Sequence, residues 1–123
     1  MTDQARFEIR LVDDIPVIEA SGELDMTNVH NFEALFTEAA EENRGVVVVS
    51  LIAVKYFDSR TIHALGTLAA QLSKNRQRLA VVLPMLPSAR VIFQMSGLRA
   101  KLDVFDDFDA AMQFAREHKI ELR

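Results

Sequence analysis

The feature that most constrains the fold is a run of β-branched and apolar residues in the middle of the chain. Residues 46–51 read Val-Val-Val-Val-Ser-Leu, without the apolar–polar alternation of a strand that has one wet face. A short continuous run of this kind is typical of a strand buried on both faces, as at the centre of a parallel or mixed sheet. The sequence therefore predicts a sheet in which this segment is a central strand.

Shorter patterns on either side supply further elements. Alternation over 7–11 and an extended pattern over 16–20, separated by Asp13 and Asp14, predict a β-hairpin. Short strands are expected at 79–83 and 102–105. Helical spacing of apolar residues predicts four helices, beginning near Thr27, Asp58, Ser88 and Asp106.

The order β-β-α-β-α-β-α-β-α predicts an α/β fold with a mixed sheet of four to five strands and about four helices. Asp25 or Thr27, Asp58, Ser88 and Asp106 are the expected helix N-caps, and Gly97 is expected just after the third helix. The third helix carries an apolar stripe of Val91, Ile92 and Met95.

Length and composition set outer limits. The 123 residues suit one domain, 1–123, and half of them are apolar. No cysteine is present, which excludes disulfides, a cysteine nucleophile and thiolate metal sites. The longest apolar stretch is far shorter than the ~20 residues of a spanning helix, and no signal peptide is visible at the N-terminus. We therefore expect a soluble cytoplasmic protein.

Signatures of catalysis and of cofactor binding are missing. The chain has no phosphate-binding loop with Lys and Ser or Thr, and its four glycines form no dinucleotide fingerprint. His30, His63 and His118 lack the spacing of a metal site, so neither a metal nor another cofactor is expected. Asp58, Ser59 and His63 can be written as a catalytic triad, but no glycine-rich elbow exposes the serine. A small serine hydrolase is thus the least favoured hypothesis, and we expect no enzyme.

The most informative segment follows the central strand. Asp58 is a good N-cap, and Ser59, Arg60 and Thr61 then fall in the first turn of a helix. Free backbone N–H groups and the helix dipole favour an anion, including a phosphate, at such a place. An ordinary capped helix with polar first-turn residues is the plainer interpretation.

At these residues the sequence resembles the STAS domain, the family of anti-sigma factor antagonists. The resemblance has four parts in the family's order, and together they cover roughly residues 6–115. They are Gly22-Glu23-Leu24-Asp25, the run 46–51 followed by Phe57-Asp58-Ser59, the strand 79–83 followed by 91–98 with its Ser-Gly-Leu ending, and Val104-Phe105-Asp106 followed by Ala110-Ala111. The resemblance implies a small mixed sheet with helices packed largely on one side.

The resemblance also implies a function. Members of this type act in partner-switching signalling that regulates transcription in bacteria, as binding modules and not as enzymes. The implied partner is an anti-sigma factor with serine kinase activity, with a phosphatase to reset the module and no direct contact with nucleic acid. The implied partner-binding residues are Asp25, Asp58, Ser59, Arg60, Thr61 and His63.

The acceptor for phosphate stays open at this point. The common family pattern is Asp-Ser-Ser/Thr-Gly with the second hydroxyl as acceptor, and here Arg60 holds that place and Thr61 the glycine place. Ser59 and Thr61 are therefore both phosphorylation candidates. The alternative is a STAS subunit that is not phosphorylated, in a larger assembly such as a stressosome or a lipid ABC transporter.

Charge is unevenly distributed along the chain. The net charge is −4, yet no acidic residue lies between Asp58 and Asp103, a stretch with seven basic residues. These are Arg60, Lys74, Arg76, Arg78, Arg90, Arg99 and Lys101. No aromatic platform for nucleic acid accompanies them. We therefore expect a basic face, centred on Ser59 and Arg60, that attracts an acidic protein surface.

Overall fold

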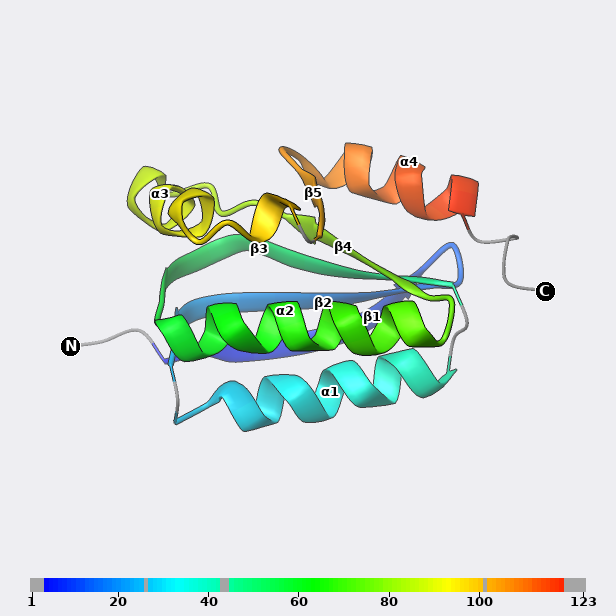
Figure 1. Ribbon diagram of the computed structural model, residues 1–123, viewed down its shortest axis with the longest axis horizontal. Coiled ribbons are helices and arrows are strands. Elements are labelled where there is room, and N and C mark those ends of the chain that lie inside the picture. The colour runs from blue at the N-terminus through cyan, green and yellow to red at the C-terminus, as the bar shows by residue number, and fades with distance from the viewer. Residues whose placement is uncertain (1–3, 26, 43–44, 101, 119–123) are drawn as a thin grey trace.

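A computed structural model describes residues 4–25, 27–42, 45–100 and 102–118. The elements follow the predicted order, with one short 3-10 turn, η1, added before the last strand (Figure 1). The strands are β1 (Arg6–Val12), β2 (Ile15–Leu24), β3 (Val46–Phe57), β4 (Arg78–Val82) and β5 (Asp103–Phe105). The helices are α1 (Val29–Glu42), α2 (Ser59–Lys74), α3 (Pro87–Met95), η1 (Leu98–Ala100) and α4 (Phe108–His118).

The strands form one mixed sheet in the order β1-β2-β3-β4-β5. β1 runs antiparallel to β2, and the other neighbouring pairs are parallel. β3 is the central strand, and Val46–Val49 and Leu51 are at most 2% exposed. The predicted fold class is confirmed, and the buried run at 46–51 marks the centre of the sheet as its lack of alternation predicts.

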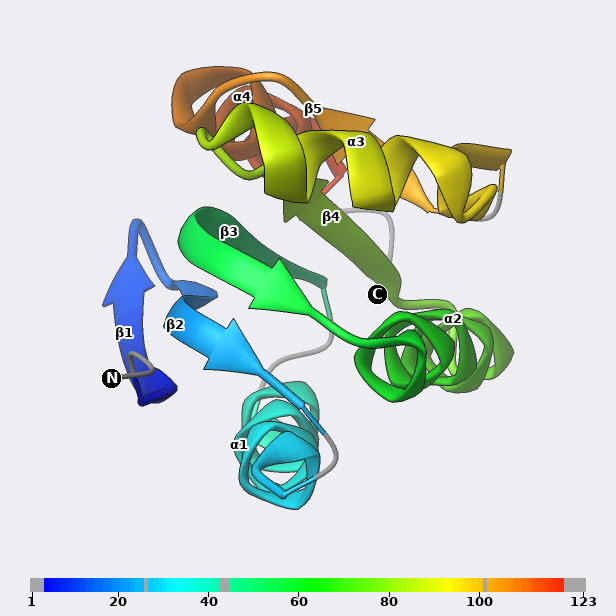
Figure 2. The same ribbon diagram turned by 90° about the vertical axis from the view of Figure 1, so that its left-hand side faces the viewer.

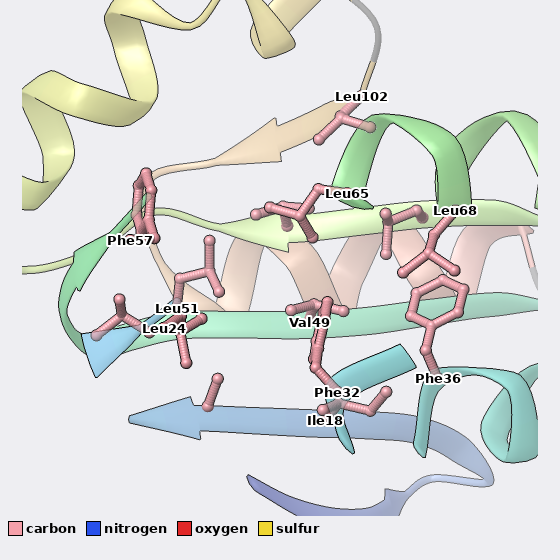
Figure 3. Close-up of a cluster of buried hydrophobic side chains, with 14 of the residues drawn as sticks. Ile18, Leu24, Phe32, Phe36, Val49, Leu51, Phe57, Leu65, Leu68 and Leu102 are labelled. Carbon is pink, nitrogen blue, oxygen red and sulfur yellow. The ribbon is translucent and has the colours of Figure 1, made fainter. Parts of the chain in front are cut away.

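Helices cover both faces of this sheet (Figure 2). The larger core cluster joins Phe32 and Phe36 of α1 and Leu65 and Leu68 of α2 to the sheet (Figure 3). Ala89 and Phe93 of α3 belong to the same cluster. The opposite face carries a smaller cluster in which α4 packs on β3 and β4. Three helices therefore share one side, as the resemblance implied, and α4 takes the other.

The β1–β2 hairpin closes with a two-residue turn at Asp13 and Asp14, where it was predicted. Both residues have positive φ, 53° and 65°, which is the geometry of a type I′ turn. Aspartate tolerates this left-handed region better than most residues. β2 carries a second irregularity, a register shift against β3 next to Gly22, whose φ of 82° favours glycine.

The helix ends test the predicted caps. Asp58 caps α2, and Gly97, with φ of 79°, follows Ser96 at the end of α3, so both predictions are confirmed. Ser88 is wrong, because α3 already begins at Pro87, a residue preorganised for the first helical position. Asp106 is also wrong, because the carboxylate that accepts from the N–H of Ala110, at 2.8 Å, belongs to Asp107.

Candidate functional site

The segments containing Asp25 and Asp58 lie side by side at the carboxyl ends of β2 and β3. Leu24 pairs with Phe57 in the parallel ladder, and the N–H of Asp58 donates to the carbonyl of Leu24 at 3.1 Å. Both strands are then followed by helices that start at this end of the sheet, on the left in Figure 1. Parallel pairing thus joins two segments that are 33 positions apart in the sequence.

Asp58 fixes the first turn of α2. Its Oδ1 accepts hydrogen bonds from the backbone N–H of Thr61 at 3.0 Å and from the Thr61 hydroxyl at 3.2 Å. Thr61 is only 1% exposed. This arrangement satisfies a buried hydroxyl and one of the N–H groups that a helix start leaves open. Thr61 therefore faces the core and Asp58, and it is withdrawn from the surface.

Ser59, Arg60 and His63 have the opposite disposition. All three are exposed and lie in the first one and a half turns of α2. The positive end of the helix dipole lies at Ser59, and the Arg60 guanidinium adds a full positive charge next to it in sequence. A negative group on the Ser59 hydroxyl would therefore meet favourable local electrostatics.

Asp25 organises the neighbouring turn between β2 and α1. Its carboxylate accepts from the N–H and the hydroxyl of Thr27 and from the side-chain amide of Asn28. In return the Asn28 side chain accepts from the N–H of Asp25 at 3.2 Å. The bond from the Thr27 hydroxyl is the chief cause that lowers the pKa of Asp25 below its usual 3.8, with the Thr27 N–H next. Asp25 is thus held as a carboxylate beside the start of α2.

Exposed apolar side chains lie in α3 and just before it, and Phe93 of this helix contacts Phe57, the residue before Asp58. We call the set Met85, Leu86, Val91 and Met95, which are 41–82% exposed, the α3 surface. It rests on a rigid base, because Phe57 packs edge-on against Phe93 of α3, with ring centroids 6.1 Å apart. The N–H of Met85 also donates to the carbonyl of Ile52 in β3. Exposed apolar groups gathered in this way are typical of a protein–protein contact.

Sequence reasoning missed the α3 surface. The stripe of Val91, Ile92 and Met95 looks like the buried side of a helix, yet Met95 is 82% and Val91 49% exposed. Ala89 and Phe93 are the buried residues of α3, and of the expected stripe Ile92 alone packs against the core, partly buried. The available signal was the excess of apolar residues in α3, since a nine-residue helix cannot bury Val91, Ile92, Phe93 and Met95 on one face.

The structure corrects the prediction of a basic face centred on Ser59 and Arg60. α2 runs from Ser59 to Lys74, so Lys74 lies about 22 Å along the helix from Ser59. Arg78 pairs with Asp103 at 3.3 Å, and Arg90 pairs with Asp106. Lys101 lies outside the described residues. Of the six basic residues of this stretch that the structure describes, Arg60 is the one in the first turn of α2.

Histidine and metal chemistry gain no site. His30 lies in α1 and contacts Glu33 at 3.3 Å, whereas His63 lies in α2 and His118 ends α4. Across the described ranges, no group of three or more His, Asp or Glu side chains is placed to hold a metal ion. The same ranges contain no helix that is long and apolar enough to cross a membrane.

Comparison with known proteins defines the family. The model of the STAS domain matches residues 6–111, most of the chain, so the chain belongs to the STAS domain family. Comparison with curated proteins gives no significant match.

Solved structures agree in fold. An anti-sigma factor antagonist from Mycobacterium paratuberculosis is 23% identical, with a TM-score of 0.81 over 93% of this chain and 96% of that one. A putative anti-sigma factor antagonist from Thermotoga maritima is 22% identical, with a TM-score of 0.74 over 89% and 94%. The antagonist SpoIIAA is 20% identical in its unphosphorylated form, with a TM-score of 0.68 over 90% and 98%. The fold is therefore that of the anti-sigma factor antagonists.

Proposed function

We propose that this STAS domain is the switchable binding module of a partner-switching pathway, with no catalytic activity of its own. Its partner is an anti-sigma factor with serine kinase activity, and Ser59 is the residue that this partner phosphorylates. The observation that supports the proposal is the contrast within one helical turn. Ser59 is exposed at the first position of α2, whereas Thr61 is 1% exposed and donates its hydroxyl to Asp58.

Accessibility favours Ser59 over Thr61 as the acceptor. A kinase must bring the acceptor hydroxyl to within bonding distance of the γ-phosphate, so the hydroxyl has to reach out from the surface. Phosphorylation of Thr61 would require the first turn of α2 to open and the Asp58 cap to break. Phosphorylation of Ser59 requires neither.

The phosphate would also be tolerated within the module itself. It adds a charge of about −1.5 to −2 at neutral pH, at the positive end of the α2 dipole and next to Arg60. The module therefore stays folded in both states. The change falls on the partner, because a dianion beside the apolar α3 surface must be desolvated before a protein can pack over it.

The module thus has two states of one surface. Unmodified, the first turn of α2 and the α3 surface together offer a polar anchor and an apolar contact area, with Asp25 and His63 at the rim. Phosphorylated, the same area carries a strongly hydrated group. A phosphatase that removes the phosphate returns the first state, and the freed or captured anti-sigma factor carries the signal to transcription.

The phosphorylation step can be tested by incubation with a candidate kinase partner and ATP, followed by mass spectrometry of the modified peptide. We expect phosphate on Ser59 in the wild type and in Thr61→Val, and none in Ser59→Ala. Thr61→Val is the matched control, because it removes the other hydroxyl at nearly the same volume. Phosphate on Thr61 in the wild type, or no complex with any such partner, contradicts the proposal.

Arg60 favours a second candidate function. It is exposed and occupies the place of the usual family acceptor, where it offers a fixed positive charge. A STAS subunit in a larger assembly needs such an anchor and no switch. In that case Ser59→Ala and Ser59→Asp both leave partner binding unchanged, while Arg60→Glu abolishes it.

A further inference from the structure

The outer edge of β1 is a second exposed surface of the protein. β1 is the first strand in the sheet order, and the described elements all lie on one side of it (Figure 2). It is a regular seven-residue strand without proline, bulge or lysine, three of the devices that protect an edge, and its charged residues are Arg6, Glu8 and Arg10. A row of backbone donors and acceptors is therefore presented to solvent.

The direction of these groups follows from the hairpin. Leu11 is paired with Pro16, which has no N–H to donate. Leu11–Pro16 is therefore a pair without backbone hydrogen bonds, and the alternation of an antiparallel ladder extends this to every second pair. The N–H and C=O groups of Phe7, Ile9 and Leu11 consequently point outward, away from β2.

We propose that this edge binds β1 of a second copy of the chain, antiparallel, with the two-fold axis at Ile9. In this register Ile9 meets Ile9 of the second copy, and Phe7 meets its Leu11. The outward backbone groups of Phe7, Ile9 and Leu11 then pair with the same groups of the second strand. The two sheets join into one continuous sheet.

Charge complementarity selects this register. Glu8 and Arg10 lie on the other face of β1, and the axis at Ile9 places each Glu8 opposite Arg10 of the second copy. An axis at Glu8 would place Glu8 against Glu8 and Arg6 against Arg10, and an axis at Arg10 would place Arg10 against Arg10. Like charges directly opposite each other destabilise a sheet, so one register is favoured and its neighbours are opposed.

Within its own sheet, Glu8 faces a residue of the same charge. It lies directly opposite Glu19 of β2, an unfavourable pair, while Arg10 reaches Glu19 diagonally at 2.5 Å. With a second copy in place, Arg10 would lie between Glu19 of its own chain and Glu8 of the other. The result is a row of alternating charge across the junction in place of two facing carboxylates.

The apolar face of the edge agrees with this arrangement. Leu11 is 67% and Ile9 37% exposed. They line a groove of about 530 Å³ between the hairpin and α1, together with Pro16, Glu38 and Ala39. In the proposed register, Phe7 of the second copy, which packs against Phe32 of its own chain, lies beside Leu11 at the edge of this groove. An ion pair at 2.9 Å between Asp13 in the hairpin turn and Arg116 of α4 attaches the hairpin to the rest of the domain.

Sedimentation velocity over a concentration series up to about 1 mM tests the proposal. Glu8→Arg and Arg10→Glu each create like-charge pairs in the homodimer, and each should weaken dimerisation about tenfold or more. An equimolar mixture of the two variants makes both cross-strand pairs opposite in charge and should restore the dimer. The double variant Glu8→Arg/Arg10→Glu should also dimerise, and it keeps an arginine near Glu19.

A backbone variant separates edge pairing from side-chain contacts. Ile9→Pro removes an outward N–H and leaves the β1–β2 ladder intact, so it should fold and remain monomeric. Hydrogen exchange of the Phe7, Ile9 and Leu11 amides should slow as the wild-type concentration rises. A wild type that stays monomeric throughout, a dimer that none of these variants changes, or edge amides protected only by another protein would overturn the proposal.

Discussion

The two exposed surfaces of this protein are built in different ways. The site at the carboxyl ends of β2 and β3 combines the capped start of α2 with the α3 surface and is made of side chains. The edge of β1 at the other side of the sheet offers backbone groups in a regular row. A side-chain surface changes its character when one hydroxyl is modified, whereas a backbone edge keeps the same donors and acceptors. If both proposals hold, the fold separates a surface that phosphorylation switches from one that stays constant.

The first prediction concerns Phe57, which lies beneath α3 at the site. Phe57 is 1% exposed and holds the end of β3 against Phe93 of α3. Phe57→Ala should lower the free energy of unfolding by about 3–5 kcal/mol, since a large cavity is left in the core. Urea denaturation measures this loss. Phe7→Ala at the half-buried edge is the comparison, and an equal loss there would contradict the difference between the two regions.

A second prediction separates the two surfaces by their partners. Met95 of the α3 surface is 82% exposed and Leu11 of the edge is 67% exposed, so a glutamine at either place should be tolerated by the fold. Met95→Gln should weaken binding of the kinase-type partner about tenfold, because apolar contact area is lost. Leu11→Gln should leave that binding unchanged. Isothermal titration calorimetry of both variants decides, and the reverse pattern contradicts the assignment.

A third prediction concerns the cap that presents Ser59. Asp58→Ala removes the acceptor of the Thr61 N–H and of its buried hydroxyl, and should cost about 1–2 kcal/mol of stability. Asp107→Ala is the matched control, because that carboxylate caps α4 at an exposed position and serves a single N–H. We expect the control to lose less in the same denaturation experiment. Equal losses would show that the buried Thr61 hydroxyl contributes nothing.

The smallest effect is a pH dependence at the turn beside the site. Because the pKa of Asp25 is lowered in the folded state, its carboxylate stabilises the fold above the unfolded pKa near 3.8. This contribution is lost as the pH falls through the lower, folded value. The stability difference between the wild type and Asp25→Asn should therefore be present at neutral pH and shrink below pH 3.8. A difference that grows on acidification contradicts this sign.

Local patterns predicted much of the fold. The buried run at 46–51, the Asp13–Asp14 turn and the Asp58 cap depend on neighbouring residues, and all three appear where the sequence places them. The extension of β3 to Phe57 and the register shift near Gly22 depend on pairing with β2, which no local pattern records. The starts of α3 and α4 lie within one or two positions of the predicted ones, because neighbouring residues alone do not determine where a helix begins.

The site was harder to predict than the fold. The hydroxyls of Ser59 and Thr61 look equivalent in the sequence, and tertiary packing alone decides that Thr61 faces the core. The apolar residues of α3 reveal that it is hydrophobic, but not that Val91 and Met95 lack a covering neighbour among the described elements. The sequence between Asp58 and Asp103 likewise shows seven basic residues but not where they lie in space. In the structure, Arg78 pairs with Asp103 and Arg90 pairs with Asp106.

The central claim is that modification of Ser59 switches partner binding. The direct measurement is calorimetric titration of an anti-sigma factor of the kinase type with the unmodified protein and with the protein phosphorylated at Ser59. We predict that phosphorylation weakens binding by about tenfold or more, while circular dichroism shows the same folded domain in both states. Equal affinity for the two forms would contradict the account.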